Sequence, residues 1–258
     1  MMWALLLLAI GLLLVGHAFR LLRWEQFVRI YERPSRGAML RGMAGGDAIN
    51  TILPLHLGDV FRAVFVGRRM KSGVGFALAT VIMDRFLDVW FVALGFGAFA
   101  LLGQGGSAAH LAARYYLLFA VLLAAALAVV VVLRDAIKRV CLAVCGIFND
   151  TLKLDGMVFC WSLINTFKDL RRIDLPRLAL NTIAMWAAYL GSYTALAAAM
   201  TAAGQPMALV DVFGALFGQS AGNLRVVLPG GVLDGAPAAA VAGMIAWYLV
   251  PLAIMWLA

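Results

Sequence analysis

Ionisable side chains interrupt stretches of this sequence that are otherwise strongly hydrophobic. Asp59 and Arg62 are followed by Asp84, Arg85 and Asp88, and the last three lie inside a long apolar run. Charged groups in an apolar helix are costly to bury, so they usually serve a function or pair with one another. Arginine binds phosphate or carboxylate through two parallel hydrogen bonds, and aspartate can balance that charge or carry a proton. These residue types indicate a buried site for a charged group.

Two short segments near opposite ends of the chain share a pattern. In each, an asparagine precedes Leu-Pro, an aspartate lies five residues after the proline, and a long hydrophobic run follows. Broken segments in corresponding positions of two halves indicate an inverted repeat with a binding site between them, and a chance resemblance is the alternative. The shared residues are Asn50, Pro54 and Asp59 in the first segment and Asn223, Pro229 and Asp234 in the second.

Each candidate binding residue also has a purely structural interpretation. Arg85 and Asp88 either contact a substrate or satisfy each other as an ion pair, and Asn50 either binds or caps a helix end. His56 titrates near neutral pH, but a loop histidine held by a carbonyl group is the alternative. The candidate binding residues are Asn50, His56, Asp59, Arg62, Asp84, Arg85, Asp88, Asn223, Arg225 and Asp234, and the residues expected to turn the chain are Pro54, Gly58, Pro229, Gly230 and Gly231.

The composition is that of an integral membrane protein. Hydrophobic residues make up 64% of the 258 residues, charged residues only 13%, and the mean hydropathy is +0.95. Soluble domains are about half apolar and a quarter charged. The net charge of +8 does not indicate nucleic-acid binding, because the basic residues lie in blocks between hydrophobic runs.

The hydrophobic runs predict an all-α, polytopic fold with about five full spans and two re-entrant helical hairpins. Prolines and glycines interrupt the two hairpin segments, so neither can form a simple spanning helix. The first run has no basic n-region or cleavage site, so we interpret it as a retained span. The expected spans are residues 3–19, 74–102, 111–133, 178–201 and 236–257, and the expected hairpins are residues 42–66 and 207–235.

Basic residues predict the orientation. Of the 21 lysines and arginines, ten lie in residues 20–71 and eight in residues 134–177. The positive-inside rule places both blocks in the cytoplasm and the N-terminus outside. Residues 134–177 alternate basic and apolar side chains, which predicts one or two amphipathic helices at the cytoplasmic surface, with a shallow dip at 157–167 as an option. We expect one membrane domain, with halves 1–133 and 178–258 joined by this connector.

Cysteine and histidine usage gives no sign of a metal or cofactor. The three cysteines form no disulfide framework, and no histidine or acidic residue completes a zinc pattern around Cys141 and Cys145. We expect no metal, no cofactor and no nucleic-acid partner.

The same residues resemble a known family, the transmembrane region of lysylphosphatidylglycerol synthases and their stand-alone flippase-like relatives. The family pattern is roughly Asn-x-x-Leu-Pro-x-Arg-x-Gly-Glu-x-x-Arg, then Glu-Arg-x-x-Asp in the next helix, then Pro-Gly-Gly-x-Gly. The chain departs from it at His56, where Arg is usual, at Asp59 and Asp84, where Glu is usual, and at Leu233, where Gly is usual. The matching residues are Asn50, Leu53, Pro54, Gly58, Arg62, Arg85, Asp88, Pro229, Gly230 and Gly231.

The resemblance implies a lipid flippase-like transporter in a bacterial-type cytoplasmic (inner) membrane. It would move an anionic phospholipid or a polyprenyl-phosphate-linked glycolipid through a polar site between the two hairpins. This sequence carries no soluble aminoacyltransferase domain, so we expect translocation without synthesis and no enzyme activity. The alternatives are an intramembrane lipid-modifying enzyme and a non-transporting subunit that supports a biosynthetic enzyme. A second copy of the chain or such an enzyme would then be the protein partner.

Overall fold

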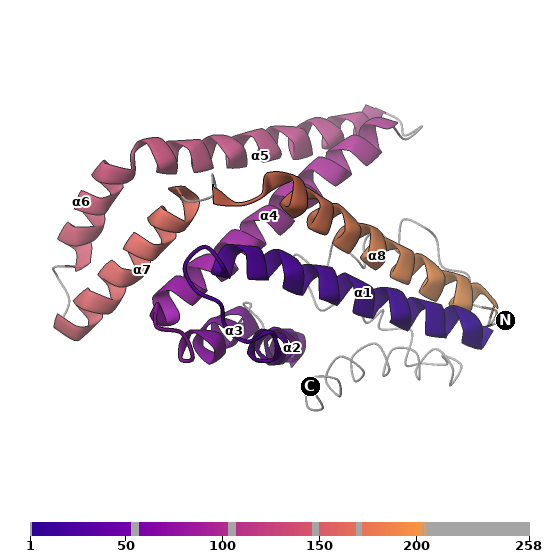
Figure 1. Ribbon diagram of the computed structural model, residues 1–258. Helices are drawn as coiled ribbons and strands as arrows, with labels where there is room; N and C mark the ends of the chain where they lie inside the picture. Colours follow the sequence, from indigo (N-terminus) through magenta and orange to yellow (C-terminus); the bar gives the residue numbers. More distant parts are fainter. Residues whose placement is uncertain are drawn as a thin grey trace. The chain divides into compact units, whose positions relative to one another are not determined.

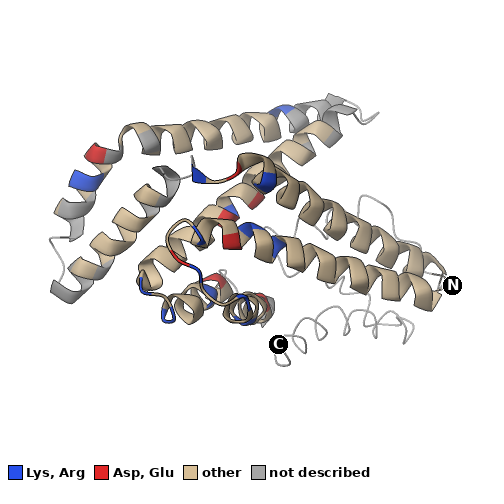
Figure 2. Cartoon of the chain, in the orientation of Figure 1, with Lys and Arg blue, Asp and Glu red and all other residues tan. Residues whose placement is uncertain are grey.

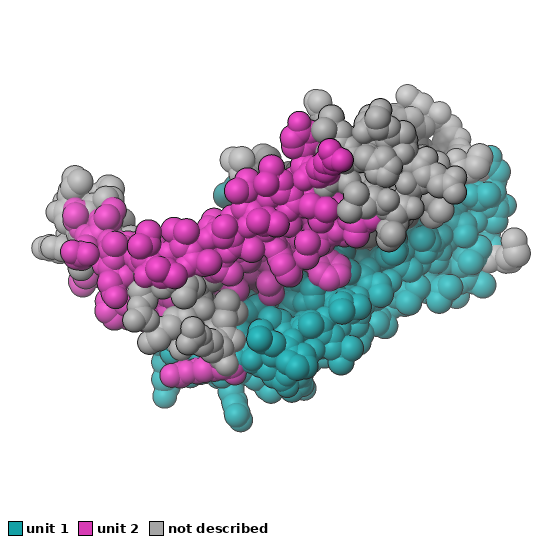
Figure 3. Space-filling model, turned by 90° about the horizontal axis from the view of Figure 1, so that it is seen from above, with its two compact units in different colours: residues 1–71, 173–258 teal, residues 72–172 magenta. Residues whose placement is uncertain are grey.

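A computed structural model describes residues 2–52, 57–102, 107–145, 150–168, 172–202 and 204. Every regular element within these ranges is an α-helix, as the sequence predicts (Figure 1). The chain forms two compact units: unit 1 comprises residues 1–71 and 173–258, and unit 2 comprises residues 72–172 (Figure 3). The arrangement of the chain as two symmetric halves around a connector stays a prediction.

Two helices of unit 1 are long and apolar enough to cross a membrane. They are α1 (Met2–Val28) and α8 (Leu175–Ala202), with 27 and 28 residues. At 1.5 Å per residue each is about 40 Å long, more than the roughly 30 Å hydrocarbon layer. Helix α1 continues unbroken past the predicted first span, residues 3–19, because no proline or glycine lies between its apolar part and Val28, and it therefore carries Arg20 and Arg23.

Small residues let α1 and α8 lie side by side and antiparallel (Figure 1). A Cβ atom on Gly16 would lie 2.5 Å from the ring of Tyr189, and one on Gly191 would lie 3.3 Å from Leu12. The hydroxyl group of Ser192, next to Gly191, donates a hydrogen bond to a backbone carbonyl of α1. Close backbone approach at small residues is the usual way in which membrane helices pack. Gly191 and Ser192 are therefore close-packing positions of α8.

Helices α2 (Arg36–Ile52) and α3 (Leu57–Gly67) form a packed pair within unit 1. Helix α2 ends before Pro54, in keeping with the bias of pre-proline residues against the helical conformation. A Cβ atom on Gly46 would lie 2.6 Å from the carbonyl oxygen of Gly58, so the two backbones touch. The expected helical pair at residues 42–66 is therefore present, and its insertion into a membrane as a re-entrant hairpin stays a prediction.

Side chains of the loops fix how α1, α2 and α3 are joined. Ser35 caps α2 by accepting a hydrogen bond from the backbone N–H of Ala38 at 3.3 Å. Lys71, after the end of α3, donates its backbone N–H to Glu32 at 2.9 Å. The second contact returns the end of α3 to the loop that follows α1.

Unit 2 consists of four helices in its described part. Helix α4 (Gly73–Leu102) packs against α5 (Ser107–Val132) and α7 (Asp150–Lys168), and α7 also packs against α6 (Arg134–Cys145). Gly73, with a positive φ of 78°, begins α4, a conformation that favours glycine. Helix α5 covers residues 111–132 of the predicted span 111–133.

The connector between the predicted halves contains two helices. On α6 and α7, the Lys138 ammonium group lies 3.8 Å from the ring centroid of Trp161, a cation–π contact between the two helices. Helix α7 is continuous from Asp150 to Lys168, so the optional dip at residues 157–167 as a shallow helical hairpin is wrong. No proline lies in that segment to break the helix. The predicted hairpin at 207–235 and the predicted span at 236–257 lie outside the described residues.

The contact between α2 and α3 generates a stability prediction. We expect Gly46→Ala to destabilise the protein by about 1–3 kcal/mol, because the new methyl group meets the backbone of α3 and forces the helices apart. The matched control is Gly11→Ala on α1, where a Cβ atom meets nothing within 4 Å and alanine favours the helix by up to about 1 kcal/mol. Thermal unfolding of the purified protein in detergent measures both changes. Equal melting temperatures for the two variants would contradict the close approach.

Candidate functional site

Three arginine side chains in the described part of unit 1 are buried. Arg20 and Arg23 on α1 and Arg62 on α3 are 7%, 0% and 1% exposed. Removing a guanidinium group from water is unfavourable unless nearby groups replace its hydration. Arginines at the membrane surface stay hydrated and do not need nearby groups to replace water. Interpreting Arg20 and Arg23 only as orientation signals therefore does not account for their burial.

A bidentate ion pair holds Arg20. Its Nη1 atom donates to both carboxylate oxygens of Asp47 on α2, at 3.0 and 2.9 Å. Charge-assisted hydrogen bonds of this kind are short and strong. The pair joins α1 to α2, because its two residues are 27 positions apart in the sequence. The carboxylate of Asp47 occupies the position at which Arg20 would bind another anion.

A cation–π contact accompanies Arg62. Its guanidinium carbon lies 4.5 Å from the ring centroid of Trp24 on α1, a side chain that is fully buried. Away from water such a contact contributes on the order of 2 kcal/mol. The close approach at Gly46 brings α2 against the same side chain, because a Cβ atom on Gly46 would lie 3.2 Å from Arg62 Cβ. Asp59, buried and one turn before Arg62 on α3, lies on the same face of that helix.

These residues form one group, which we call the arginine cluster. It contains three guanidinium groups and two carboxylates, so its formal charge is +1. The buried carboxylate of Glu25 lies apart from this balance, since it pairs with Arg29 at 2.8 Å and Arg36 at 3.0 Å. A cationic group of fixed arginines in a low-dielectric interior attracts anions. The arginine cluster comprises Arg20, Arg23, Arg62, Asp47, Asp59 and Trp24.

Figure 2 shows how the charges are placed along unit 1. The long apolar part of α1 carries no lysine, arginine or acidic residue, and its charges begin at its C-terminal end. Helices α2 and α3 bring Asp47, Asp59 and Arg62 to the other side of the cluster. The buried charged side chains in the described part of unit 1 lie on α1 and α3.

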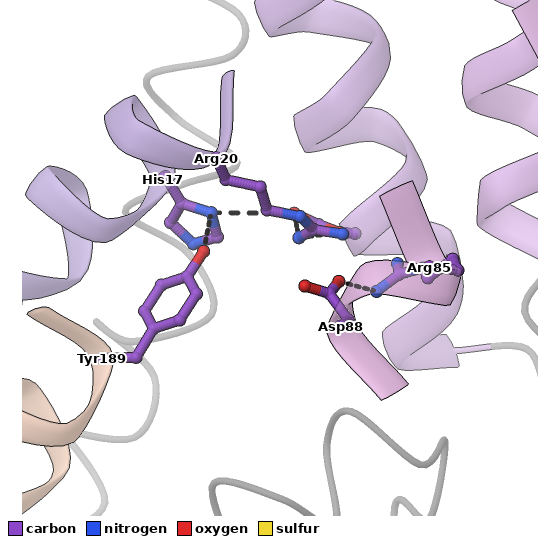
Figure 4. Close-up of polar contacts among 6 residues, drawn as sticks. His17, Arg20, Arg85, Asp88 and Tyr189 are labelled. Carbon is purple, nitrogen blue, oxygen red and sulfur yellow. Dashed lines mark hydrogen bonds and ion pairs between the residues drawn. The ribbon is translucent and has the colours of Figure 1, made fainter. Parts of the chain in front are cut away.

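A histidine and a tyrosine adjoin the arginine cluster. His17 lies one turn before Arg20 on α1, and its Nδ1 atom is 3.2 Å from the hydroxyl group of Tyr189 on α8 (Figure 4). The same nitrogen is 3.8 Å from a carboxylate oxygen of Asp47. Polar contacts thus join α8, α1 and α2.

Unit 2 has a separate group of buried charges on α4. Asp84 is fully buried, Asp88 is 5% exposed, and the two lie four positions apart on one face of the helix. Arg85 Nη1 is 3.6 Å from Asp88 Oδ2 (Figure 4). Two carboxylates against one guanidinium group give these three residues a formal charge of −1. The group in unit 2 is acidic, whereas the arginine cluster of unit 1 is cationic.

The predicted site residues divide among these groups. Asp59 and Arg62 belong to the arginine cluster, and Asp84, Arg85 and Asp88 form the group on α4. Asn50 has the structural contact that the sequence left open, because its side-chain oxygen accepts a hydrogen bond at 2.7 Å from the backbone N–H of Gly58 at the start of α3. The other predicted residues lie outside the described part of the chain: His56, Asn223, Arg225, Asp234, Pro54, Pro229, Gly230 and Gly231.

Sequence reasoning missed six residues of the site and its surroundings: His17, Arg20, Arg23, Trp24, Asp47 and Tyr189. A signal for some of them was present, since Arg20, Arg23 and Trp24 fall on one helical face directly after an apolar run. Asp47 carried a signal as well, because it lies between glycine and alanine in an uncharged stretch. Tyr189 had none, because its contact with His17 joins residues 172 positions apart.

Comparison with known proteins identifies the family of this chain. Residues 1–256 match the model of the family described as the lysylphosphatidylglycerol synthase TM region. No curated protein and no solved structure matched the chain. Within the described residues, no group of three or more His, Cys, Asp or Glu side chains is placed to hold a metal ion. Because the match covers almost the whole chain, this protein is an integral membrane protein that belongs to the lysylphosphatidylglycerol synthase transmembrane-region family.

Proposed function

We propose that this protein moves a lipid with an anionic headgroup across the membrane and binds that headgroup at the arginine cluster. The observation that carries the proposal is the burial of Arg20, Arg23 and Arg62 in one unit with a formal excess of positive charge. Membership of a family of membrane proteins linked to lipids supports the proposal as well.

The chemistry of lipid translocation calls for such a cluster. A charged headgroup must cross a hydrocarbon layer about 30 Å thick, and it loses its hydration on the way. Arginine replaces that hydration efficiently, because its planar guanidinium group binds a phosphate through two parallel hydrogen bonds. In the absence of lipid, the carboxylate of Asp47 serves Arg20 as an internal counter-ion, with both of its oxygens on one guanidinium nitrogen. A headgroup phosphate would exchange with it.

The substrate that fits this chemistry is an anionic phospholipid or a polyprenyl-phosphate-linked glycolipid. Both offer phosphate oxygens to the arginines, and neither requires a metal. In this proposal α2 and α3 form the first re-entrant hairpin, residues 207–235 form the second, and the basic blocks face the cytoplasm of a bacterial-type inner membrane. The carboxylates on α4 would then hold a cationic group or serve a structural purpose.

Reconstitution distinguishes the proposal from two other functions. Purified protein in vesicles that contain headgroup-labelled phosphatidylglycerol should relocate the lipid between leaflets without altering its mass. A change of lipid mass would identify an intramembrane enzyme. Neither relocation nor a change of mass would favour a supporting subunit, which would be expected to bind a biosynthetic enzyme or a second copy of the chain.

The arginine cluster generates a transport prediction. We expect Arg62→Gln to lower the translocation rate of labelled phosphatidylglycerol by about tenfold or more, because a charge-assisted hydrogen bond contributes about 1.5–3 kcal/mol. Arg62→Lys should restore only part of the rate, since lysine lacks the planar fork that stacks on Trp24. Arg41→Gln, on an exposed part of α2, is the control and should transport at the normal rate. Equal rates for Arg62→Gln and Arg41→Gln would exclude Arg62 from the site.

The group on α4 generates a second prediction, which separates a structural pair from a substrate site. If Arg85 mainly balances Asp88, Arg85→Gln should destabilise the protein by about 1–3 kcal/mol, and the double variant Arg85→Gln/Asp88→Asn should regain most of that loss. The transport rate of the double variant should then stay near normal. Full stability of the double variant together with lost transport would assign the pair to the substrate instead.

A further inference from the structure

One oxygen atom of Asp47 faces two cationic or potentially cationic groups. Its Oδ2 atom accepts a hydrogen bond from Arg20 Nη1 at 2.9 Å and lies 3.8 Å from His17 Nδ1. The nitrogen of His17 is in turn 3.2 Å from the Tyr189 hydroxyl group (Figure 4). The proposed transport function uses Arg20 and Asp47 but leaves His17 without a role.

The protonation state of His17 determines how many positive charges lie next to the carboxylate of Asp47. In the neutral tautomer with its proton on Nε2, Nδ1 accepts a hydrogen bond from the hydroxyl group of Tyr189, and its lone pair offers nothing to the carboxylate. With both ring nitrogens protonated, the imidazolium carries a positive charge, and its Nδ1 atom lies 3.8 Å from the carboxylate of Asp47. Arg20 and His17 then compete for the same oxygen atom. Histidine is the side chain that ordinarily changes charge between pH 5 and 8.

In the described part of unit 1, each helix around His17 carries other ionisable groups. Helix α8 contributes Tyr189 and, one turn further, the buried Tyr193; neither phenol titrates near neutral pH. Helix α2 contributes Asp47, and α1 itself contributes Arg20 and Arg23. Helix α3 contributes Asp59 and Arg62, and the second of these lies against Trp24. The arginines remain charged at all accessible pH values. Within this set, His17 is the residue whose ordinary titration range lies closest to neutral pH.

We propose that His17 is a proton-operated switch that makes Arg20 available to the lipid headgroup. A proton taken from solvent onto Nδ1 draws the carboxylate of Asp47 toward the imidazolium, and the guanidinium group of Arg20 binds the headgroup phosphate in its place. One proton is taken up for each anion bound and is released when the anion leaves. The inference rests on the proposed function, because it concerns the regulation of the same site.

The sign of the pH dependence follows from this exchange. The protonated form of His17 favours the anion, so affinity for the anionic lipid should rise as pH falls through the titration of His17 and level off below it. Linkage of one proton limits the change to about tenfold per pH unit. A neutral zwitterionic lipid carries no net charge for the released Arg20 to balance, so its binding should depend much less on pH.

Calorimetric titration of the full-length protein in detergent tests the proposal. The probe is short-chain phosphatidylglycerol, with short-chain phosphatidylcholine as the reference, between pH 5 and 8. We expect phosphatidylglycerol to bind more tightly at low pH. In the middle of this range the binding heat should depend on the ionisation enthalpy of the buffer, as it does when a proton is taken up. This second measurement needs no variant, and a buffer-independent heat across the whole range would overturn the proposal.

Three variants locate the proton. His17→Gln keeps a hydrogen-bond acceptor for Tyr189 but cannot become charged, so its affinity should stay at the weaker, high-pH level throughout. Asp47→Asn removes the competing carboxylate, so its affinity should stay at the tighter, low-pH level throughout. His110→Gln on α5 in unit 2 is the matched control and should keep the full pH dependence. Opposite affinity levels with the same loss of slope would be hard to obtain by misfolding.

Two results would separate failure of this inference from failure of the proposed function. If phosphatidylglycerol binds and is translocated but its pH dependence survives in His17→Gln, or is lost only in His56→Gln, then His17 is not the switch and the transport proposal stands. If phosphatidylglycerol neither binds nor moves at any pH, the proposed function fails together with the inference.

Discussion

Burial of guanidinium groups is the constraint on which unit 1 depends. Arg20, Arg23 and Arg62 lie inside a helical assembly, where an uncompensated charge would be strongly unfavourable. The fold meets this constraint with a carboxylate on one side, Asp47, and an aromatic face on the other, Trp24. Because these two groups come from α2 and α1, the cluster can exist only while α1, α2 and α3 are packed together.

Glycines at the helix contacts let the helices pack closely enough for these polar groups to meet. The backbones of α2 and α3 touch at Gly46 and Gly58, which places α2 against the base of the Arg62 side chain. On the other side of α1, Gly16 accommodates the ring of Tyr189 and brings its hydroxyl group to His17. The glycines therefore help to hold the polar groups of the site together, although none of them carries a charge. A larger side chain at these positions would move the polar groups apart.

The two groups of buried charge differ in sign and in construction. In unit 1 the cations outnumber the carboxylates, and their contacts join residues far apart in the sequence. On α4 in unit 2 the carboxylates outnumber the cation, and the ion pair forms within a single helical turn. A pair within one turn requires no tertiary structure, so it fits a structural role more easily. A cluster assembled from three helices can respond to a ligand through their packing, which suits a binding site.

The sequence alone determined the helical membrane class, the family, the positions of most helices and the presence of charge at Asp59, Arg62, Asp84, Arg85 and Asp88. These features follow from composition and local periodicity, which depend on residues that are close together in the sequence. Tertiary structure decided which charges meet. It carried α1 past its apolar part, so that Arg20 and Arg23 became buried, and it brought Asp47 and Tyr189 to them from distant segments. Contacts across 27 and 172 positions depend on helix packing, and local sequence patterns do not encode it.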